Sequence, residues 1–312
     1  MNQRDWTVES TDAGVRLDKY LADATRLGSR GKALAALERG KIFVNGSEAG
    51  VADAARRLNA GDAVRTWMDR PGSAKARRTG VQSTGDLEII FEDASLLVVN
   101  KPAGLLAVPL ERKSAAPSVQ QQIETYLRPF GKRRPFVVHR IDQDTSGLVV
   151  FAKDADAQSR LKLQFKRRQP ERVYLAVVYG RPEPAEGRWR DHLVWDDKAL
   201  IQKQTHPRDP NAQEAISDYR VRESFRDTSL IEVRLQSGRR NQIRIQARLR
   251  GHTLVGEKRY TYGPEMLRPI QFERHALHAW RLGFDHPVDG RRLLFEAPLP
   301  ADFEALLARL RS

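Results

Sequence analysis

One stretch near the middle of the chain organises the rest: Val137-Val138-His139-Arg140-Ile141-Asp142-Gln143-Asp144-Thr145-Ser146-Gly147-Leu148-Val149-Val150-Phe151-Ala152-Lys153. Its two apolar runs, residues 137–138 and 148–152, are short and β-branched, as expected of buried strands. The segment between them is too polar for a core and too short for a free linker. Such a segment, held between strands, is a common way to mount reactive side chains on a rigid scaffold.

The charge of the chain predicts a polyanionic partner. Its 312 residues include 54 Lys and Arg against 40 Asp and Glu, so the formal net charge is 54 − 40 = +14, and the isoelectric point is near 10.2. A chain of this length can form two or three domains with a sizeable core. We expect nucleic acid as the partner, ahead of an anionic membrane surface or a charge that serves only solubility.

The absence of cysteine excludes several classes of site. Disulfides, cysteine nucleophiles and cysteine-ligated zinc or iron–sulfur centres are ruled out, and with them the zinc nucleobase deaminases. No apolar run approaches the roughly 18 residues of a membrane span, and the polar residues 1–10 do not read as a signal peptide. We therefore expect a cytoplasmic protein without membrane association.

Residues 16–67 predict a small α/β module. Apolar residues recur at helical spacing over 17–24, and Ser29 is placed to cap a second helix that Gly40 ends. A short apolar strand follows, and Asn45-Gly46 is a tight hairpin signal. Basic residues of the polar faces are Arg16, Lys19, Arg26, Arg30, Lys32, Arg39 and Lys41. They suit a grip on a folded RNA backbone, although an ordinary solvated surface is the plainer interpretation.

A basic linker is predicted between two domains. Residues 68–85 contain Pro, Gly and Ser that break any period, together with several Lys and Arg. The linker either lets the first domain, residues 1–67, search RNA independently or serves as a passive spacer. The second domain is expected over residues 86–312.

The second domain reads as strands in succession with few helices between them. The expected strands cover residues 87–91, 96–99, 172–180, 199–203, 215–221 and 230–235, and the expected helices cover 119–127, 154–165, a segment that ends at 250, and 300–310. This order predicts an α+β fold with a mixed, largely antiparallel sheet rather than a doubly wound one. The outer face and exit of the second expected helix carry Arg160, Lys162, Lys166, Arg167 and Arg168, for which we expect a role in gripping phosphate.

Three segments resemble the signature motifs of the RluA-type pseudouridine synthases. His139-Arg140-Ile141-Asp142, two further residues and Thr145-Ser146-Gly147 resemble the family's His-Arg-Leu-Asp-x-x-Thr-Ser-Gly motif. Residues 172–180 resemble its second motif, with Tyr174 at the position of the active-site tyrosine. Residues 237–246 resemble its Gly-Arg-Thr-His-Gln-Ile-Arg-x-His motif, with Arg244 at the position of the arginine that pairs with the catalytic aspartate.

The resemblance extends over most of the chain. Residues 100–104 are similar to a Lys-Pro-x-Gly turn beside the family's active-site cleft. Residues 255–260, 274–279 and 286–287 match its closing pattern. In the first domain, residues 16–21, 29–30, 40–46 and 61–62 resemble the S-four RNA-binding domain, which is named after a ribosomal protein.

The resemblance implies isomerisation of uridine to pseudouridine within RNA, in a catalytic domain with flanking helices and a central cleft. Nothing is added or removed, so no redox cofactor, metal or methyl donor is expected. Asp142 is then the catalytic aspartate, as nucleophile or charge stabiliser, and Arg244 keeps it charged and oriented by paired hydrogen bonds. Tyr174 offers an aromatic face and a hydroxyl. Expected substrate contacts are His139, Arg140, Lys101, Arg239 and Gln242, and expected RNA contacts of the first domain are Arg16, Lys19, Arg30, Lys32 and Lys41.

Some residues depart from the family pattern. Arg240 and Asn241 stand where Thr and His are usual, and Gln246 replaces the second His. These departures put local RNA contacts in doubt more than the chemistry. His275 and His278 do not predict a metal site, because residues three apart in a strand-like run point to opposite faces.

Two other functions stay open from the residues alone. A non-catalytic RNA-binding or ribosome-assembly protein would have no need of Asp142, Tyr174 and Arg244 together. A carboxylate-dependent nucleoside or sugar hydrolase would use Asp142 with Asp144, whereas Asp144 otherwise caps the turn with Thr145 and the following serine. By analogy with family members that carry the appended domain, we expect ribosomal RNA of the large subunit as the target, ahead of transfer RNA, and a monomer.

Overall fold

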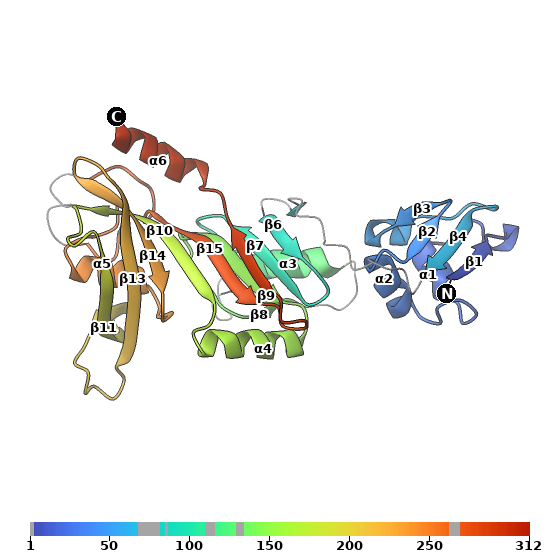
Figure 1. The fold of residues 1–312 in the computed structure, drawn as a ribbon, viewed down its shortest axis with the longest axis horizontal. Coiled ribbons are helices and arrows are strands. Elements are labelled where there is room, and N and C mark those ends of the chain that lie inside the picture. The colour runs from blue at the N-terminus through green and yellow to red at the C-terminus, as the bar shows by residue number, and fades with distance from the viewer. Residues whose placement is uncertain (1–2, 68–81, 85–86, 110–115, 129–133, 262–268) are drawn as a thin grey trace. The chain divides into compact units, whose positions relative to one another are not determined.

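The computed structural model describes residues 3–67, 82–84, 87–109, 116–128, 134–261 and 269–312. The chain divides into two compact units, within residues 1–77 and 78–312, and each is described by itself (Figure 1). Most of the predicted linker, residues 68–85, lies outside the described residues, but residues 82–84 form a strand of the second unit. None of the helices in the described ranges is long and apolar enough to cross a membrane.

The first unit is an antiparallel sheet backed by short helices. The strand order is β1-β4-β2-β3. Its strands are β1 (Gln3–Thr7), β2 (Ile42–Val44), β3 (Ser47–Ala49) and β4 (Ala63–Trp67), and its helices are α1 (Leu17–Leu21), α2 (Arg30–Glu38) and the 3-10 turns η1 (Ser10–Asp12) and η2 (Val51–Ala55). A core of its own, which includes Leu17, Tyr20, Leu37, Ile42 and Val64, joins the helices to the sheet.

Local sequence signals explain the boundaries of these elements. The Ser29 hydroxyl accepts a hydrogen bond from the Lys32 amide (3.2 Å) and so caps α2. Asn45 and Gly46 have φ of 52° and 78°, as a two-residue hairpin turn requires. These predictions are confirmed. The first helix is shorter than the expected 17–24, and β1 was not predicted because its sequence, QRDWT, is mostly polar.

The second unit is built on one large mixed sheet. Its strand order is β12-β11-β13-β14-β10-β15-β9-β7-β6-β5, with β16 on β15 and β8 on β9. The strands are β5 (Gln82–Thr84), β6 (Leu87–Glu92), β7 (Leu96–Lys101), β8 (Phe136–Val137), β9 (Ser146–Ala152), β10 (Glu171–Tyr179), β11 (Glu186–Asp196), β12 (Ile201–Gln204), β13 (Gln213–Ser224), β14 (Thr228–Leu235), β15 (Leu277–Asp285) and β16 (Arg292–Glu296). The helices are α3 (Val119–Leu127), α4 (Ala155–Lys166), α5 (Gln242–Leu249) and α6 (Ala301–Arg311).

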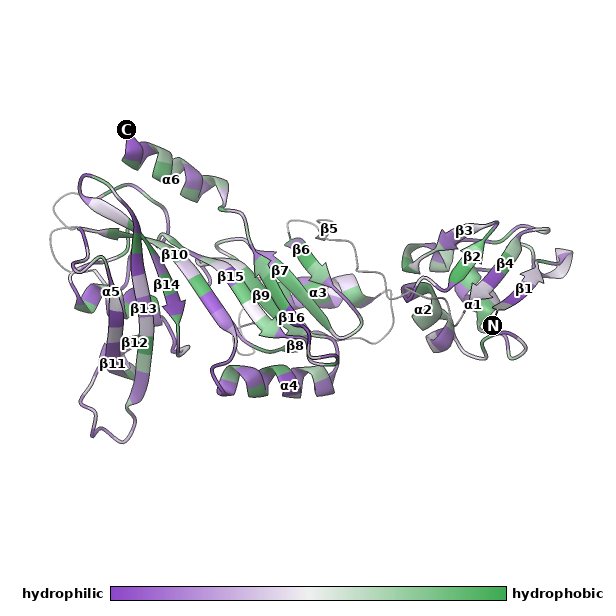
Figure 2. Cartoon of the chain, viewed as in Figure 1, coloured by the Kyte–Doolittle hydropathy of each residue, from purple (hydrophilic) through white to green (hydrophobic). Residues whose placement is uncertain are grey.

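Helices cover both faces of this sheet. On β9, Val149 and Phe151 pack in the cluster that contains α3 and α5, whereas Leu148 and Val150 pack in the cluster that contains α4. Strands β6, β7 and β9 are accordingly among the most hydrophobic elements (Figure 2). Burial on both faces explains why residues 148–152 form a continuous apolar run instead of an alternating one.

The two halves of the sheet meet where β9 begins. Among the strand pairs of the described residues, β9 with β15 is parallel and the others are antiparallel, and the parallel register covers only His278↔Ser146 and Ala279↔Gly147. Gly147 has φ +112°, and a Cβ there would lie 2.2 Å from the carbonyl oxygen of Ala279. Only glycine fits this close approach, so it fixes the join directly after residues 139–146.

The expected fold class is confirmed: the sheet is mixed and largely antiparallel, with flanking helices. Several strands were not predicted: β11, whose sequence contains several Arg, Asp and Trp residues and no clean apolar run, and also β5, β15 and β16. A further difference is at residues 137–138, where β8 covers Phe136–Val137 and Val138 already belongs to the loop.

Candidate active site

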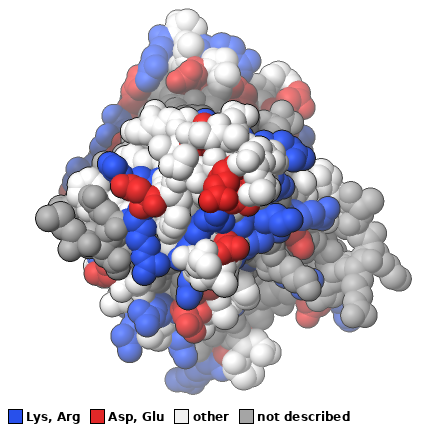
Figure 3. Space-filling model, turned by 90° about the vertical axis from the view of Figure 1, so that its right-hand side faces the viewer, with Lys and Arg blue, Asp and Glu red and all other residues white. Residues whose placement is uncertain are grey.

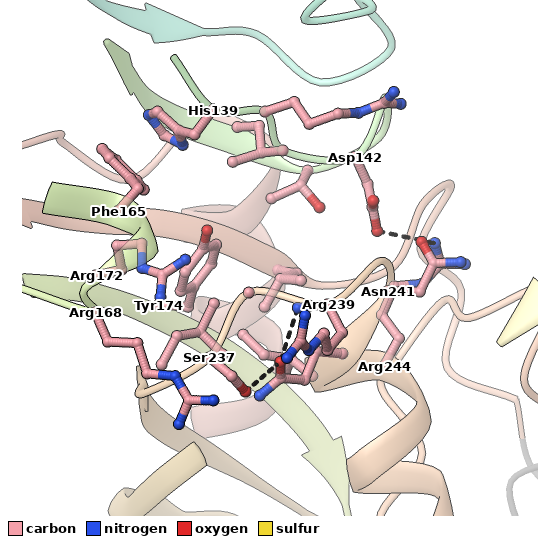
Figure 4. Close-up of a pocket in the computed structure, with 18 of the residues that line it drawn as sticks. His139, Asp142, Phe165, Arg168, Arg172, Tyr174, Ser237, Arg239, Asn241 and Arg244 are labelled. Carbon is pink, nitrogen blue, oxygen red and sulfur yellow. Dashed lines mark hydrogen bonds and ion pairs between the residues drawn. The ribbon is translucent and has the colours of Figure 1, made fainter. Parts of the chain in front are cut away.

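A pocket of about 550 Å³ opens in the second unit between the loop after β8, strand β10 and the turn before α5 (Figure 4). This volume is in the range of small-molecule sites. Asp142, Tyr174 and Arg244, the three residues expected to carry the chemistry, all line it. They come from three elements that are far apart in the sequence.

Arg244 is held by two carboxylates. Its Nε and Nη2 donate to the two carboxylate oxygens of Glu257 (2.6 and 2.7 Å), and its Nη1 donates to Oδ2 of Asp142 (3.2 Å). The expected paired hydrogen bonds therefore go to Glu257, and Asp142 receives a single one. The reason is burial: Glu257 is almost without solvent and needs the full guanidinium fork, whereas Asp142 faces the pocket.

The sequence analysis did not identify Glu257. Burial opposes its ionisation, but the hydrogen bonds and charge of Arg244 hold the pKa of this carboxyl below its ordinary value. Burial also opposes the charge on Arg244. The hydrogen bonds and negative charges of Glu257 and Asp142 outweigh this effect and raise the pKa of Arg244 above its ordinary value. Glu257 follows Gly256, whose φ of +73° and close contact with the Arg274 carbonyl exclude a side chain. In the sequence, Gly256 was the feature that could have indicated the tight turn on which Glu257 lies.

The loop that carries Asp142 is fixed by Lys101. Lys101 is fully buried at the end of β7, and its ammonium donates to the backbone carbonyls of Pro102, Leu105 and Gln143 (2.8, 2.8 and 2.6 Å). Burial lowers its pKa to about 7, against the charge of Asp144. Lys101 does not line the pocket: two of its hydrogen bonds hold the turn that follows β7, and the third holds the loop that carries Asp142. The expected substrate contact stays a prediction.

Two histidines hold the other side of the same loop. The ring of His275 is hydrogen-bonded to the Thr145 hydroxyl (2.8 Å), and the ring of His278 to the Ser146 hydroxyl (2.9 Å). Burial lowers the pKa of His275 to about 3 and that of His278 to about 4, so both are neutral at pH 7. Among the described residues no group of three or more His, Asp or Glu side chains is placed to hold a metal ion.

Asp144 is placed differently from Asp142. Its side chain is exposed, does not line the pocket and makes no hydrogen bond within the described part of the chain. The expected cap of the turn is therefore absent, and Thr145 bonds to His275 instead. Residues 138–145 form a loop, so the two carboxylates do not share a strand face.

Tyr174 lies between the Asp142 side of the pocket and a group of arginines (Figure 4). The side chain is 8% exposed, and its hydroxyl makes no hydrogen bond to any described residue. Burial raises its pKa to about 12, with Asp142 acting in the same direction and Arg172 opposing. The hydroxyl is therefore protonated at neutral pH and is free to donate a hydrogen bond into the pocket.

His139 and Arg140 line the pocket in different ways. The Nε2 atom of His139 accepts a hydrogen bond from the Val150 amide (3.1 Å), and its ring stacks on Phe165 at 4.6 Å between centroids. Burial and the nearby Arg172 lower its pKa to about 3. His139 thus presents a neutral ring that is fixed by the scaffold, whereas Arg140 is exposed and available to a ligand.

The turn before α5 is fixed by an amide network. Gln242 is buried; its Oε1 accepts from the Ser237 hydroxyl and the Arg239 amide (both 2.9 Å), and its Nε2 donates to Ile216 O. Gln242 lines the pocket, but its amide is used in hydrogen bonds within the protein, so the expected substrate contact stays a prediction. Arg239 lines the pocket and donates through Nε to the carbonyl of Glu214 (3.0 Å).

The departures from the family pattern have structural explanations. Gln246 is fully buried; its Oε1 accepts from the Ser217 hydroxyl (2.7 Å) and its Nε2 donates to Asp191 (2.8 Å). Asn241 donates to the Tyr260 hydroxyl (3.0 Å) and accepts from Arg244 Nη1 (3.3 Å). Asn241 therefore contacts a residue of the expected chemistry directly, so its departure concerns the site as well as RNA contacts.

The expected RNA contacts of the first unit lie on its surface. Arg16 and Arg30 both pair with Asp18 (3.1 and 2.6 Å), which is buried and holds them side by side. Lys19 and Lys32 are exposed, and Lys41 is half-buried. The face drawn in Figure 3 carries Lys and Arg side chains in several groups, with Asp and Glu among them.

Comparisons with known proteins identify the family of the chain. The RNA pseudouridylate synthase family matches residues 95–249. An uncharacterised RNA pseudouridine synthase of Bacillus subtilis, YlyB, is 36% identical and covers 100% of this chain and 99% of its own length. A ribosomal large subunit pseudouridine synthase D of Zymomonas mobilis is 33% identical and covers 95% of this chain and 94% of its own.

Two solved structures are similar in fold to most of this chain. Human RNA pseudouridylate synthase domain containing 4 has a TM-score of 0.59 and 23% identity, over 72% of this chain and 92% of that one. Human RNA pseudouridylate synthase domain containing 1 has a TM-score of 0.57 and 22% identity, over 75% and 98%. With the full-length relatives above, these findings show that the chain belongs to the RluA type of the RNA pseudouridine synthase family and isomerises uridine to pseudouridine in RNA.

Proposed function

We propose that this enzyme modifies ribosomal RNA of the large subunit, with Asp142 as the catalytic carboxylate and without a cofactor. The observation that carries the proposal is the chain Asp142–Arg244–Glu257, which points one half-buried carboxylate into a pocket of nucleotide size. Arg244 is anchored from behind by Glu257, so its remaining donor orients Asp142 before substrate arrives.

The chemistry assigns one task to each side of the pocket. The bond from ribose C1′ to uracil N1 breaks, a bond from C1′ to C5 forms, C5 loses its proton and N1 gains one. Asp142 acts as nucleophile or stabilises the charge of the separated fragments. Tyr174, protonated and without a hydrogen bond to any described residue, offers its ring to the uracil and its hydroxyl for hydrogen bonding. The target uridine must leave its stack, at a cost of a few kcal/mol that basic contacts offset.

Asp144 is the weaker candidate for the catalytic role. It is exposed, lies outside the pocket and has no partner that would orient it among the described residues. The same placement argues against a hydrolase with paired carboxylates, because the second carboxylate does not face the space where a substrate would bind.

Support for a ribosomal target comes from the names of relatives. The Zymomonas protein and a 31% identical protein of Nitrosomonas europaea are both called ribosomal large subunit pseudouridine synthase D. The domains proposed are an S-four-like RNA-binding domain over residues 1–67, a linker over 68–85 and the catalytic domain over 86–312. Because one chain supplies every residue of the pocket, a monomer suffices.

Tritium release tests the proposal. Large-subunit ribosomal RNA labelled at C5 of uracil is incubated with wild type, Asp142→Asn and the matched control Asp144→Asn. We expect release by wild type and the control, and none by Asp142→Asn. Release by Asp142→Asn would move the catalytic role elsewhere. Release from labelled transfer RNA but not from ribosomal RNA would overturn the target.

The role of the first unit is tested by deleting residues 1–70. We expect weaker RNA binding and a smaller dependence of affinity on salt, because fewer phosphate contacts release fewer counterions. The intact pocket should still release tritium at saturating RNA. An unchanged salt dependence would contradict RNA binding by this unit.

A further inference from the structure

Among the described residues, one cation of the pocket has no hydrogen-bonding or acidic partner. Arg172 lies on β10 two residues before Tyr174, so both side chains project from the same face of the strand into the pocket. Its Nε is shielded from solvent and unbonded, and no described residue forms a hydrogen bond or an ion pair with its guanidinium. Burying a guanidinium without a partner is unfavourable, and a bound anion is one way to satisfy such a group.

Two further arginines approach the same place. Arg168 and Arg239 also line the pocket, and Figure 4 shows Arg168 beside Arg172. Burial and the charge of Arg168 lower the pKa values of Arg172 and Arg239, because neighbouring cations repel. The opposing acid is Glu214, whose carboxylate lies 3.6 Å from Arg168 but forms no ion pair with Arg172. The three arginines therefore carry more positive charge than Glu214 neutralises.

The backbone around this group is adapted to it. Arg168 follows the end of α4 with φ +59°, a left-handed conformation in which glycine is usual. Gly238 has no Cβ where one would lie 2.4 Å from Nη1 of Arg172. Phe165 lies under the Arg172 guanidinium at 5.6 Å from its ring centre. Arg168 is in a strained backbone conformation, and Gly238 leaves room for the Arg172 side chain. Both features are typical of a binding site that the fold is arranged to form.

We propose that Arg172, with Arg168 and Arg239, binds a phosphate group of the RNA strand within one nucleotide of the target uridine. The proposal rests on the proposed function and adds a subsite to it. Guanidinium groups suit phosphate because several N–H donors meet its oxygens at once. Arg172 and Arg168 lie on the far side of Tyr174 from Asp142, and Arg239 lines the same pocket (Figure 4). A nucleotide whose ribose meets Asp142 can therefore direct a neighbouring phosphate to these arginines.

Binding of small probes tests the subsite without turnover. The Nε–H signal of Arg172 is followed by ¹⁵N NMR in the full chain and assigned with Arg172→Lys, while uridine 3′,5′-bisphosphate, uridine or inorganic phosphate is added. We expect the bisphosphate to shift this signal at lower concentrations than inorganic phosphate does, and uridine to leave it unchanged. Equal shifts by uridine, or no shift by the bisphosphate, would overturn the phosphate assignment. Equal potency of inorganic phosphate would show a site for the free anion and overturn the RNA contact.

Variants then connect the subsite to RNA. Arg172→Gln should raise KM for ribosomal RNA by about 10- to 100-fold, as expected for a lost hydrogen bond to a charged group, and reduce the slope of log affinity against log salt by about 0.7. Arg172→Lys should keep the slope. The matched control is Arg311→Gln, which removes one charge at the end of α6, far along the chain and outside the pocket lining.

The same variants separate a binding role from a structural one. Arg172→Gln loses the contact with Phe165 but no hydrogen bond to a described residue, so its Tm should stay close to that of wild type. A clear fall would assign Arg172 to the fold and overturn the proposal. Wild-type KM and slope in Arg172→Gln would also overturn it. A wild type that shifts the Arg172 signal with bisphosphate but releases no tritium would instead remove the proposed function and leave the subsite.

Discussion

Replacement of Glu257 by glutamine tests how the pocket keeps Arg244 in place. The change preserves shape but removes the charge that opposes a buried guanidinium. One of the two hydrogen bonds from Arg244, at 2.6 and 2.7 Å, is lost, because the amide nitrogen of glutamine donates and cannot accept. Arg244 then has its 3.2 Å bond to Asp142 as the remaining strong anionic contact.

The magnitude follows from burial. Removing one partner of a buried ion pair costs about 3–5 kcal/mol, and the one hydrogen bond that glutamine keeps returns about 1 kcal/mol. We therefore expect Glu257→Gln to lower the free energy of unfolding by about 2–4 kcal/mol. With its anchor weakened, Arg244 orients Asp142 less well. We expect kcat to fall by about 10- to 100-fold, since each factor of ten is about 1.4 kcal/mol of activation free energy. Glu257 does not line the pocket, so KM should change little.

Urea unfolding and tritium release measure the two effects. Turnover is compared at a temperature where all variants are folded, so that lost stability does not appear as lost kcat. Glu186→Gln is the matched control, because Glu186 forms an exposed pair with Arg220 that is expected to contribute less than about 1 kcal/mol. Glu257→Asp keeps the charge and should recover part of kcat. Wild-type kcat in Glu257→Gln would refute a positioning role, and wild-type stability would refute the buried pair.

Three further outcomes follow from the loop around Asp142. Gly147→Ala should prevent folding of the second unit or lower its Tm by more than about 5 °C, because the new Cβ meets the Ala279 carbonyl at 2.2 Å; a wild-type thermal scan would contradict the join. Lys101→Met should lower the free energy of unfolding by about 3 kcal/mol or more, since three carbonyls lose their donor; unchanged urea unfolding would contradict this. His275→Gln should reduce the loss of stability between pH 6.5 and 4.5 by about 2 kcal/mol. The unfolded state binds a proton there and the folded state, with its His275 pKa near 3, does not; equal pH profiles in urea unfolding would contradict it.

Local patterns predicted the elements that depend on a few neighbouring residues. The Ser29 cap, the Asn45-Gly46 turn and the apolar strand before Lys153 need no information from elsewhere in the chain, and the structure confirms them. The pocket residues Asp142, Tyr174 and Arg244 were predicted because each lies in a motif of its own. Their meeting in one pocket came from the resemblance and not from periodicity.

What the sequence analysis missed depends on burial that the sequence does not record. Gln242 and Lys101 look like surface residues in the sequence, yet both are buried and bonded to backbone carbonyls. Glu257 lies 13 residues after Arg244, at a distance set by a turn rather than by a helix or strand, so no spacing rule pairs the two. Strand β11 was missed for a related reason. Its charged residues, such as Arg188, which forms an ion pair with Asp218 of β13, interrupt the apolar pattern that would indicate a strand.

The position of Gly147 explains why the motif around Asp142 combines reactive and structural residues. Asp142 comes from the half of the sheet that contains β7 and β9, whereas Tyr174 and Arg244 come from the half that contains β10 and α5. The halves join through two residue pairs of β9 and β15, and Gly147 is one of those residues. Asp142 lies five residues before this join, so its loop leaves the sheet close to where the two halves meet. A carboxylate held there can keep its hydrogen bond to Arg244 of the other half before substrate arrives, as a preorganised site requires.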